Sequence, residues 1–337
     1  MKRILPLFLA LALLLAGCTA VSTTETTSQA VSQVDSPSSA LESAAESASS
    51  QLESISITDS NGSQITLDTS APRVVAAYGS FAEAWLLAGG ELVGVTQDAL
   101  EQRDLGLPED IAVVGTVKEP NAEEIIALEP DLVLLASDIT AQADIRDVLE
   151  NAGLACAFFQ VDTFADYAFM MEQLCAVTGR EDLYEENVTQ VGQQIEEAQA
   201  NAALSSFRPN VLLIRAFSTG IKAKTDDELA GAILKDLGAH NIADDHPSML
   251  EDLSLEEVIA ADPDYIFVTT MGDEQKALDY LNGLIQQNPA WSELSAVKED
   301  RYVVLPKDLF HYKPNNRWGE SYQYLGEILY PEVFHEE

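Results

Sequence analysis

Two clusters of side chains in the C-terminal half are of the types that bind small anions. In the first, Arg215 ends a predicted strand, and Lys222 and Lys224 lie in the predicted loop directly after it. The second occupies a Pro- and Asn-rich loop and consists of His311, Tyr312, Lys313 and Arg317. Guanidinium groups pair with anionic oxygens through two parallel hydrogen bonds. In a chain of net charge −38, cations grouped at strand ends indicate an anionic ligand.

The residues of these two clusters differ in how strongly they support a ligand-binding role. Each lysine could equally be a solvated surface charge, whereas Arg215 is flanked by apolar residues. Tyr78 could form an aromatic wall, while a core position is favoured for Trp85. The predicted ligand-binding residues are Tyr78, Arg215, Lys224, His311, Tyr312 and Arg317.

The sequence predicts neither a resident metal nor a catalytic residue. The four histidines do not have the spacing of a zinc or manganese site. Gly79-Ser80 at a strand-to-helix turn is compatible with a nucleophile elbow, but Gly-x-Ser-x-Gly, a P-loop and a convincing dinucleotide fingerprint are absent from the sequence. A secreted hydrolase and an adhesion or scaffold protein remain alternative hypotheses.

A segment that occurs twice indicates how the elements are arranged. The first copy is NAEEIIALEPDLVLLA at 121–136, and the second is SLEEVIAADPDYIFVT at 254–269. Each begins with a capping residue three positions before a Glu (Glu124, Glu257), which is typical of a capping box. A short helix, a Pro-Asp turn and a buried strand follow. Two copies predict two lobes of similar construction, with a ligand cleft between them.

Strands alternate with helices along the chain, which predicts an α/β fold with mostly parallel, doubly wound sheets. We expect two Rossmann-like lobes, at 54–178 and 206–337, joined by one long helix within 179–205. Predicted strands are 56–58, 64–67, 74–77, 92–95, 132–136, 156–161, 211–216, 265–269 and 302–305. Predicted helices are 81–87, 141–151, 181–203, 228–237, 274–282 and one from 318 onward.

The N-terminus predicts export. Lys2 and Arg3 precede an apolar run at 4–16, which is too short to span a bilayer and suits a signal peptide. Leu15-Ala16-Gly17-Cys18 resembles a bacterial lipobox, so we expect cleavage after residue 17 and acylation of Cys18. An ordinary cleavage site with a chance Cys is the alternative. Residues 18–53, poor in large apolar side chains, are predicted to be a disordered tether on the outer face of the cell membrane.

The net charge limits the possible binding partners, and the number of cysteines limits the possible disulfide bonds. A strongly negative chain is repelled by phosphates, which excludes nucleic acid as a partner. Besides Cys18, only Cys156 and Cys175 remain. A disulfide between them and two buried thiols are both compatible with the sequence.

Short motifs spread over the whole folded region carry a family resemblance. They are 73–75 (RVV), 78–83 (YGSFAE), 92–96 (LVGVT), 114–115 (VG), 288–291 (NPAW) and 301–304 (RYVV). The chain resembles the substrate-binding lipoproteins of ABC importers for ferric siderophores, haem and vitamin B12. The resemblance implies two α/β lobes joined by one long helix, a monomer without an intrinsic cofactor, and an ABC permease as partner.

The resemblance also implies roles for particular residues. In a vitamin B12-binding member, one acid on each lobe docks onto permease arginines, and these acids align with Glu123 and Glu256. The alternative is that both acids only complement a helix dipole. A ferric siderophore is the expected ligand, followed by haem and then a corrinoid. For haem iron the possible ligands are His246, Met249, His311 and Tyr312.

Overall fold

The computed structural model describes residues 54–251 and 253–334. The predicted signal peptide at 1–17, the lipidation site Cys18 and the tether at 18–53 lie outside these ranges. Within them, no helix combines the length and the apolar character needed to cross a lipid bilayer.

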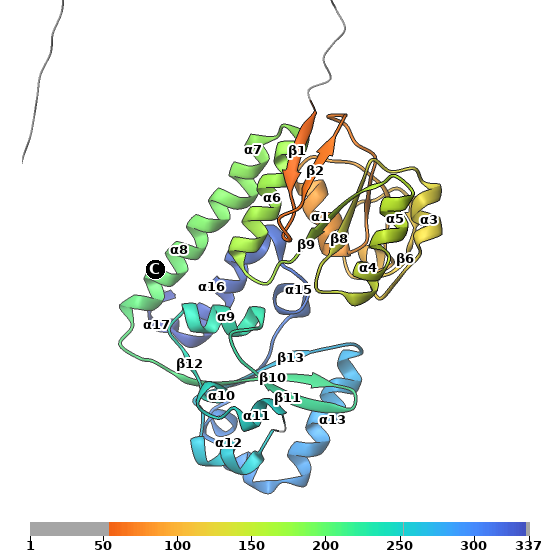
Figure 1. Cartoon of the computed structure of the whole chain (residues 1–337). Coiled ribbons are helices and arrows are strands. Elements are labelled where there is room, and N and C mark those ends of the chain that lie inside the picture. The colour runs from red at the N-terminus through yellow and green to blue at the C-terminus, as the bar shows by residue number, and fades with distance from the viewer. Residues whose placement is uncertain (1–53, 252, 335–337) are drawn as a thin grey trace, which may run out of the picture. The chain divides into compact units, whose positions relative to one another are not determined.

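The N-terminal lobe is built on a five-stranded sheet in which all neighbouring strands are parallel (Figure 1). In order across the sheet the strands are β5 (Ala112–Val113), β4 (Leu92–Val95), β3 (Val74–Ala76), β8 (Leu132–Ala136) and β9 (Ala155–Phe159). The lobe adds two antiparallel pairs, β1 (Ile55–Thr58) with β2 (Gln64–Leu67) and β6 (Gly115–Thr116) with β7 (Glu119–Pro120). Its helices are α1 (Gly79–Leu87), α2 (Asp98–Glu101), α3 (Ala122–Ala127), α4 (Thr140–Asp144), α5 (Arg146–Asn151) and α6 (Phe164–Thr178).

Both faces of this sheet are covered by helices. Leu132 and Leu134 of β8 belong to the apolar cluster that contains residues of α1 and α6. Val133 and Leu135 belong to a second cluster, with Ile125 of α3 and residues of α5. Every residue of β8 is buried, which explains why this strand appears in the sequence as a continuous apolar run.

A long helical connection follows the N-terminal lobe. Gly179 ends α6 in the left-handed conformation, with φ of 68°. Helical structure resumes in α7 (Glu181–Tyr184), a π-helical turn (Glu185–Thr189) and α8 (Gln190–Leu204). This stretch coincides with the helix predicted at 181–203, and Gly192 lies inside α8 without ending it. The late helix α16 (Trp318–Leu329) packs against α8 and so braces the connection.

The C-terminal lobe contains a mixed sheet of five strands. In order they are β11 (Gly220–Lys224), β10 (Asn210–Phe217), β13 (Tyr265–Thr270) and β14 (Tyr302–Val304), while β12 (His240–Asn241) also pairs with β10. Only the pair formed by β10 and β11 is antiparallel in this sheet. The α-helices are α9 (Leu229–Asp236), α10 (Ile242–Asp245), α11 (Ser248–Glu251), α12 (Leu255–Ala261), α13 (Glu274–Gln287), α14 (Ser295–Lys298), α15 (Lys307–Phe310), α16 and α17 (Pro331–Phe334). Two 3₁₀ turns span Pro289–Glu293 and Asn315–Arg317.

Strand β11 corrects the sequence interpretation. The sequence predicts a loop for Lys222 and Lys224, but both lie on β11, where Lys222 is paired with Arg215 of β10. The strand is short and alternates Ile221 and Ala223 with lysines, so its apolar signal is weak. The cations therefore belong to a hairpin and not to a free loop.

The two copies of the repeated segment fold alike, as α3 followed by β8 and as α12 followed by β13. Glu129 and Asp262 occupy corresponding positions before a proline, and both adopt left-handed backbone conformation, with φ of 47° and 42°. A non-glycine residue rarely takes this conformation. Its occurrence at the same place in both lobes shows that the turn geometry is repeated together with the sequence.

The acid after each proline ties its turn to a neighbouring strand. Asp131 accepts a hydrogen bond from the backbone N–H of Arg73 at 2.7 Å. Asp264 accepts one from the backbone N–H of Asn210 at 2.8 Å. Each bond lies where a central strand begins. The same Asp-to-backbone hydrogen bond therefore fixes the first residue of a central strand in both sheets.

The predicted capping boxes form only in part. Asn121 and Ser254 cap their helices by accepting backbone N–H groups. Neither Glu124 nor Glu257 returns the bond to its capping residue; Glu257 instead accepts the hydroxyl of Ser248 at 3.0 Å. The helix starts are therefore predicted correctly, while the assigned role of the two glutamate side chains is wrong.

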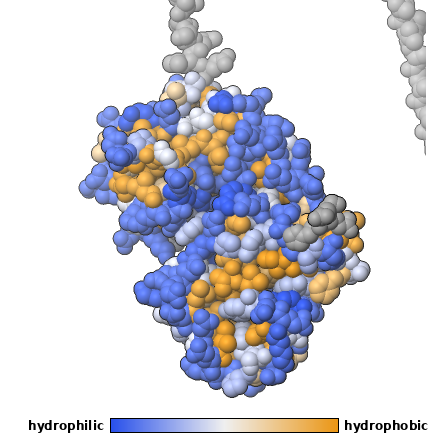
Figure 2. All heavy atoms as spheres, turned by 180° about the vertical axis from the view of Figure 1, so that it is seen from behind, coloured by the Kyte–Doolittle hydropathy of each residue, from blue (hydrophilic) through white to orange (hydrophobic). Residues whose placement is uncertain are grey.

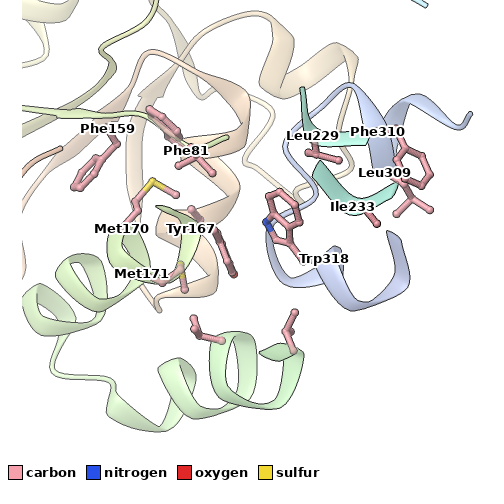
Figure 3. Packing of buried hydrophobic residues seen from close by; sticks show 14 of the residues in the cluster. Phe81, Phe159, Tyr167, Met170, Met171, Leu229, Ile233, Leu309, Phe310 and Trp318 are labelled. Carbon is pink, nitrogen blue, oxygen red and sulfur yellow. The ribbon is translucent and has the colours of Figure 1, made fainter. Parts of the chain in front are cut away.

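One apolar cluster extends from the N-terminal lobe through the connecting helix into the C-terminal lobe. Figure 3 shows Phe81, Phe159, Tyr167, Met170 and Met171 together with Leu229, Ile233, Leu309, Phe310 and Trp318. The rings of Phe164 and Trp318 meet edge to face, with centroids 6.4 Å apart. Packing of this kind restrains how the lobes move. The surface seen in Figure 2 is mainly hydrophilic, with hydrophobic residues gathered in patches.

Candidate functional site

A cavity of about 710 Å³ is lined by residues of both lobes. The N-terminal side includes Tyr78 and Asp98, each just after a strand of the parallel sheet. The C-terminal side includes Arg215 on β10 and the loop residues His311 and Tyr312. Loops that follow the carboxyl ends of parallel strands are the usual place for a ligand in such sheets.

Four of the six predicted ligand-binding residues line this cavity, namely Tyr78, Arg215, His311 and Tyr312. Lys224 does not line it, and its ammonium group is paired with Glu228 at 2.7 Å. Arg317 lines a separate cavity of about 320 Å³. The prediction thus found residues on both walls of the cleft and placed two cations there that the structure does not.

Arg317 is held outside the main cavity by two carboxylates. Its guanidinium group contacts Glu320 at 2.6 Å and Asp308 at 2.8 Å. Both hydrogen bonds raise the pKa of Arg317, the bond to Glu320 being the larger cause. The sequence placed this residue in the Pro- and Asn-rich loop, but it could not show that acids nearby in the chain occupy the guanidinium.

The charge balance of the main cavity differs from the sequence expectation. Its lining includes Lys118, Arg215 and Lys313 as cations, and these face five carboxylates, of Asp98, Asp138, Asp162, Asp227 and Glu228. Two of the cations are paired in place, because Arg215 contacts Glu228 and Lys313 contacts Asp162 at 3.0 Å. The lining of the cavity therefore carries charges of both signs, with more carboxylates than cations.

Arg215 nevertheless retains a free donor. Its Nη2 donates to Glu228, whereas its Nε is buried and has no hydrogen-bond partner among the described residues. An unsatisfied donor in a buried position costs about 1–3 kcal/mol. The donor therefore favours an oxygen acceptor within its reach.

His311 is a neutral imidazole on the C-terminal wall. Burial is the largest cause that lowers its pKa, to about 4, and the positive charges of Arg215, Lys307 and Lys313 add to it. A neutral imidazole keeps a lone pair for a metal ion. Tyr312 lies beside it, with ring centroids 5.3 Å apart.

Asp98 is a site residue that sequence reasoning missed. It is 8% exposed, lines the cavity and accepts the backbone N–H of Gly79 at 2.7 Å through Oδ2. A Cβ on Gly79 would lie 2.7 Å from that oxygen and 2.9 Å from the backbone N of Ala99, so this close approach requires glycine. The Tyr78-Gly79 pair was a usable signal, but the acid that it contacts lies too far along the chain for a local pattern to reveal.

Tyr78 stands next to Asp98 on the N-terminal wall. Burial is the largest cause that raises the pKa of Tyr78, and the negative charges of Asp98 and Asp138 act in the same direction. Lys313 and Arg103 oppose the shift. The phenol stays protonated at neutral pH and can donate a hydrogen bond to a ligand.

The loop that carries His311 and Tyr312 is fastened to the N-terminal lobe. Asn315 is fully buried and donates to the backbone oxygen of Ser80 at 2.9 Å and to Glu83 at 2.5 Å. Arg103 donates to the backbone oxygen of Lys313 at 2.9 Å and also pairs with Glu83. The second wall of the cleft is thus positioned by residues of the first lobe.

Glu123 and Glu256 occupy corresponding first-turn positions of α3 and α12, and both are exposed. Neither takes part in an ion pair within the described residues. They do not line the main cavity. Their carboxylates are therefore available to a partner outside the ligand site.

The structure also bears on the predictions for the cysteines and for a metal site. Cys156 and Cys175 are buried free thiols. Burial is the main cause that raises the pKa of each thiol, to about 12 and about 11. Within the described ranges, no group of three or more His, Cys, Asp or Glu side chains is arranged to hold a metal ion.

Two α/β lobes, a helical connection and a polar cavity between the lobes define a protein that binds a small molecule. The family model described as periplasmic binding protein matches residues 74–309. The chain therefore belongs to the periplasmic binding protein family, in the branch of substrate-binding proteins of ABC importers. Family members serve transport and are not enzymes, which confirms the prediction that this chain is not one.

Known relatives cover most of the chain. The Fe(3+)-citrate-binding protein YfmC of Bacillus subtilis is 26% identical over 270 residues, covering 77% of this chain and 81% of the relative. The high-affinity heme uptake system protein IsdE of Staphylococcus aureus is 22% identical over 224 residues, covering 66% of this chain and 75% of IsdE.

Solved structures show the same fold. S. aureus IsdE complexed with heme matches with a TM-score of 0.64 and 19% identity, covering 77% of this chain and 99% of that one. The siderophore-binding protein BauB, bound to two acinetobactin molecules and ferric iron, matches with a TM-score of 0.65 and 19% identity, covering 85% and 100%. These likenesses confirm the predicted fold class.

Proposed function

We propose that this chain is a lipid-anchored protein on the outer face of the cell membrane that captures an iron chelate, in the first place a ferric siderophore, and delivers it to an ABC permease. The observation that carries the proposal is the interlobe cavity lined by Arg215, whose buried Nε has no hydrogen-bond partner among the described residues. Chelate oxygens are acceptors for such a donor. Relatives named for ferric citrate, heme and a ferric siderophore support the same ligand class.

Haem is the second candidate, and His311 favours it. The imidazole lines the cavity and its pKa is lowered to about 4, so it is neutral at physiological pH. A single neutral His is sufficient as an axial ligand to haem iron. The other haem ligands considered from the sequence, His246 and Met249, do not line this cavity.

The absorption spectrum of protein purified from its native host tests both candidates. A ferric catecholate or hydroxamate is expected to give a broad visible charge-transfer band, and a Soret band would identify haem instead. Added ligand should also raise the melting temperature without being converted to product. Absence of stabilisation by ferric citrate, a ferric hydroxamate, a ferric catecholate and haemin would contradict the proposed ligand class.

Anchoring is proposed on the sequence Leu15-Ala16-Gly17-Cys18. Replacing the acylated residue, Cys18→Ala, should release or mis-process the protein, because two acyl chains are needed for stable membrane attachment. The measurement is detergent phase partitioning of cell fractions, with Cys175→Ala as the matched control. A Cys18→Ala protein that still partitions with detergent would contradict the anchor.

Docking to the permease is proposed for Glu123 and Glu256. Both carboxylates are exposed, lie outside the ligand cavity and occupy corresponding helix starts on the two lobes. A pair of acids at matching places fits two basic positions on a partner that contacts both lobes at once.

A further inference from the structure

We infer that the chelate bound by this protein carries a protonated amine, and that Asp98 is the residue that recognises it. The inference rests on the proposed function, because it names a subclass of iron chelate for the same cavity. It begins from an unpaired acceptor: Oδ1 of Asp98 is buried and has no hydrogen-bond partner among the described residues. The residue as a whole is 8% exposed and lines the cavity.

The Asp98 carboxylate is fixed in place. Its Oδ2 accepts the backbone N–H of Gly79 at 2.7 Å, and the absence of a Cβ at Gly79 permits that approach. One oxygen is therefore committed to the protein, while Oδ1 is buried without a partner among the described residues in a side chain that lines the cavity. A buried carboxylate oxygen without a partner is costly, and a cationic donor compensates it better than a neutral one.

The surrounding charges favour a cation at this wall. The cavity contains five carboxylates, and two of its cations, Arg215 and Lys313, already pair with Glu228 and Asp162. A ligand that presented only anionic groups would face Asp98 and Asp138, and in the cavity lining the N-terminal lobe sets only Lys118 against these two acids. A ligand that also carries an ammonium group satisfies both walls, and close pairs of this kind contribute strongly to specificity.

The same contacts set the orientation of the ligand. The free donor, Nε of Arg215, belongs to the C-terminal lobe, and the free acceptor, Oδ1 of Asp98, belongs to the N-terminal lobe. Chelate oxygens therefore face Arg215, and the amine-bearing arm faces Asp98. Binding of one ligand then engages both lobes with opposite charges.

The test uses ferrioxamine B, a ferric hydroxamate with a pendant ammonium group, and its N-acetylated form, which lacks only that charge. Fluorescence titration of the wild type should show at least tenfold tighter binding of the amine form, or about 1.4 kcal/mol. Asp98→Asn keeps an acceptor for Gly79 and removes the charge. It should abolish this preference, leaving the affinity for the acetylated form within about twofold.

Asp110→Asn, at an exposed acid outside the cavity lining, is the matched control and should retain the preference. Equal affinity of the wild type for both forms would overturn the inference while leaving the proposed function intact. Equal weakening of both forms by Asp98→Asn would also overturn it, since that result marks a purely structural residue. If the wild type binds neither ferrioxamine form, the inference fails. If it also binds neither ferric citrate, a ferric catecholate nor haemin, the proposed function fails with it.

Discussion

The two lobes begin their central strands with the same turn, yet they offer different chemistry to the cleft. Glu129 and Asp262 share a left-handed conformation, and Asp131 and Asp264 make equivalent hydrogen bonds to the starts of β3 and β10. Beyond the strands the likeness ends. On the N-terminal wall Asp98 has an acceptor without a partner among the described residues, and on the C-terminal wall the paired Arg215 has a donor without one.

This contrast shows which parts of a duplicated architecture are free to diverge. The turn and the buried strand maintain the sheet, so a change there costs stability in either lobe. The loops after the strands contribute little to the stability of the sheet, so their side chains can differ between the lobes. Two lobes of the same plan thus build a cleft whose N-terminal wall has more acidic than basic side chains and whose C-terminal wall has equal numbers of both.

The largest expected effect concerns Glu123 and Glu256, the exposed acids at corresponding helix starts of the two lobes. Glu123→Ala combined with Glu256→Ala should abolish stimulation of the permease ATPase and leave ligand affinity unchanged, because neither acid lines the cavity. The measurement is ATPase activity of the permease in liposomes, beside a ligand titration. Glu124→Ala with Glu257→Ala removes equal charge from the same helix turns and should retain stimulation. Equal loss of ligand binding in the first pair would contradict a docking role.

The two lobes show which helices and strands could be predicted from the sequence. Helix and strand positions in the repeated units followed from apolar periodicity and from Pro-Asp turns, and the structure agrees with them. Strand β11 was missed because two lysines interrupt its apolar pattern. Local pattern is a weak guide where a strand lies at a sheet edge.

The site was harder to predict than the fold. Arg215 and His311 could be proposed because cations and imidazoles are rare in this acidic chain. Asp98 could not, since one acid among 56 acidic residues has no distinguishing local pattern. Its importance arises from a contact with Gly79 and from an oxygen without a partner. That Arg317 lines a different cavity could not be predicted either, because its pairing with Asp308 and Glu320 is a property of the folded loop.

A second prediction tests how the C-terminal wall depends on the N-terminal lobe. Asn315→Ala should lower the free energy of unfolding by about 2–3 kcal/mol, because it leaves the backbone oxygen of Ser80 and the carboxylate of Glu83 short of a buried donor. Urea denaturation measures the change. Asn151→Ala, at an exposed position, is the control and should change stability by less than about 0.5 kcal/mol. A similar stability for both variants would mean that the loop holds its place without this contact.

A third prediction addresses Arg215 on the C-terminal wall. Arg215→Ala should weaken binding of the iron chelate by more than tenfold, equivalent to about 1.4 kcal/mol, since it removes the free donor and leaves Glu228 paired only with Lys224. Most of the change should appear as faster dissociation, which stopped-flow fluorescence measures. Lys298→Ala removes an exposed cation paired with Glu293 and should leave affinity unaltered. Unaltered affinity in Arg215→Ala would remove this residue from the site.

The last prediction is a pH dependence that belongs to the C-terminal wall. The pKa of His311 is lowered to about 4, whereas an unfolded His titrates near 6.5. Between these values the unfolded chain binds more protons than the folded one, so stability falls as pH falls from about 6.5 towards 4. From pH 6.5 to pH 5 the wild type should lose about 1–2 kcal/mol more than His311→Gln, which has no proton to gain. Parallel urea denaturation of the two proteins at both pH values measures the difference. Identical losses would show that the pKa of His311 is the same in the folded protein as in the unfolded chain, which would contradict the lowered pKa.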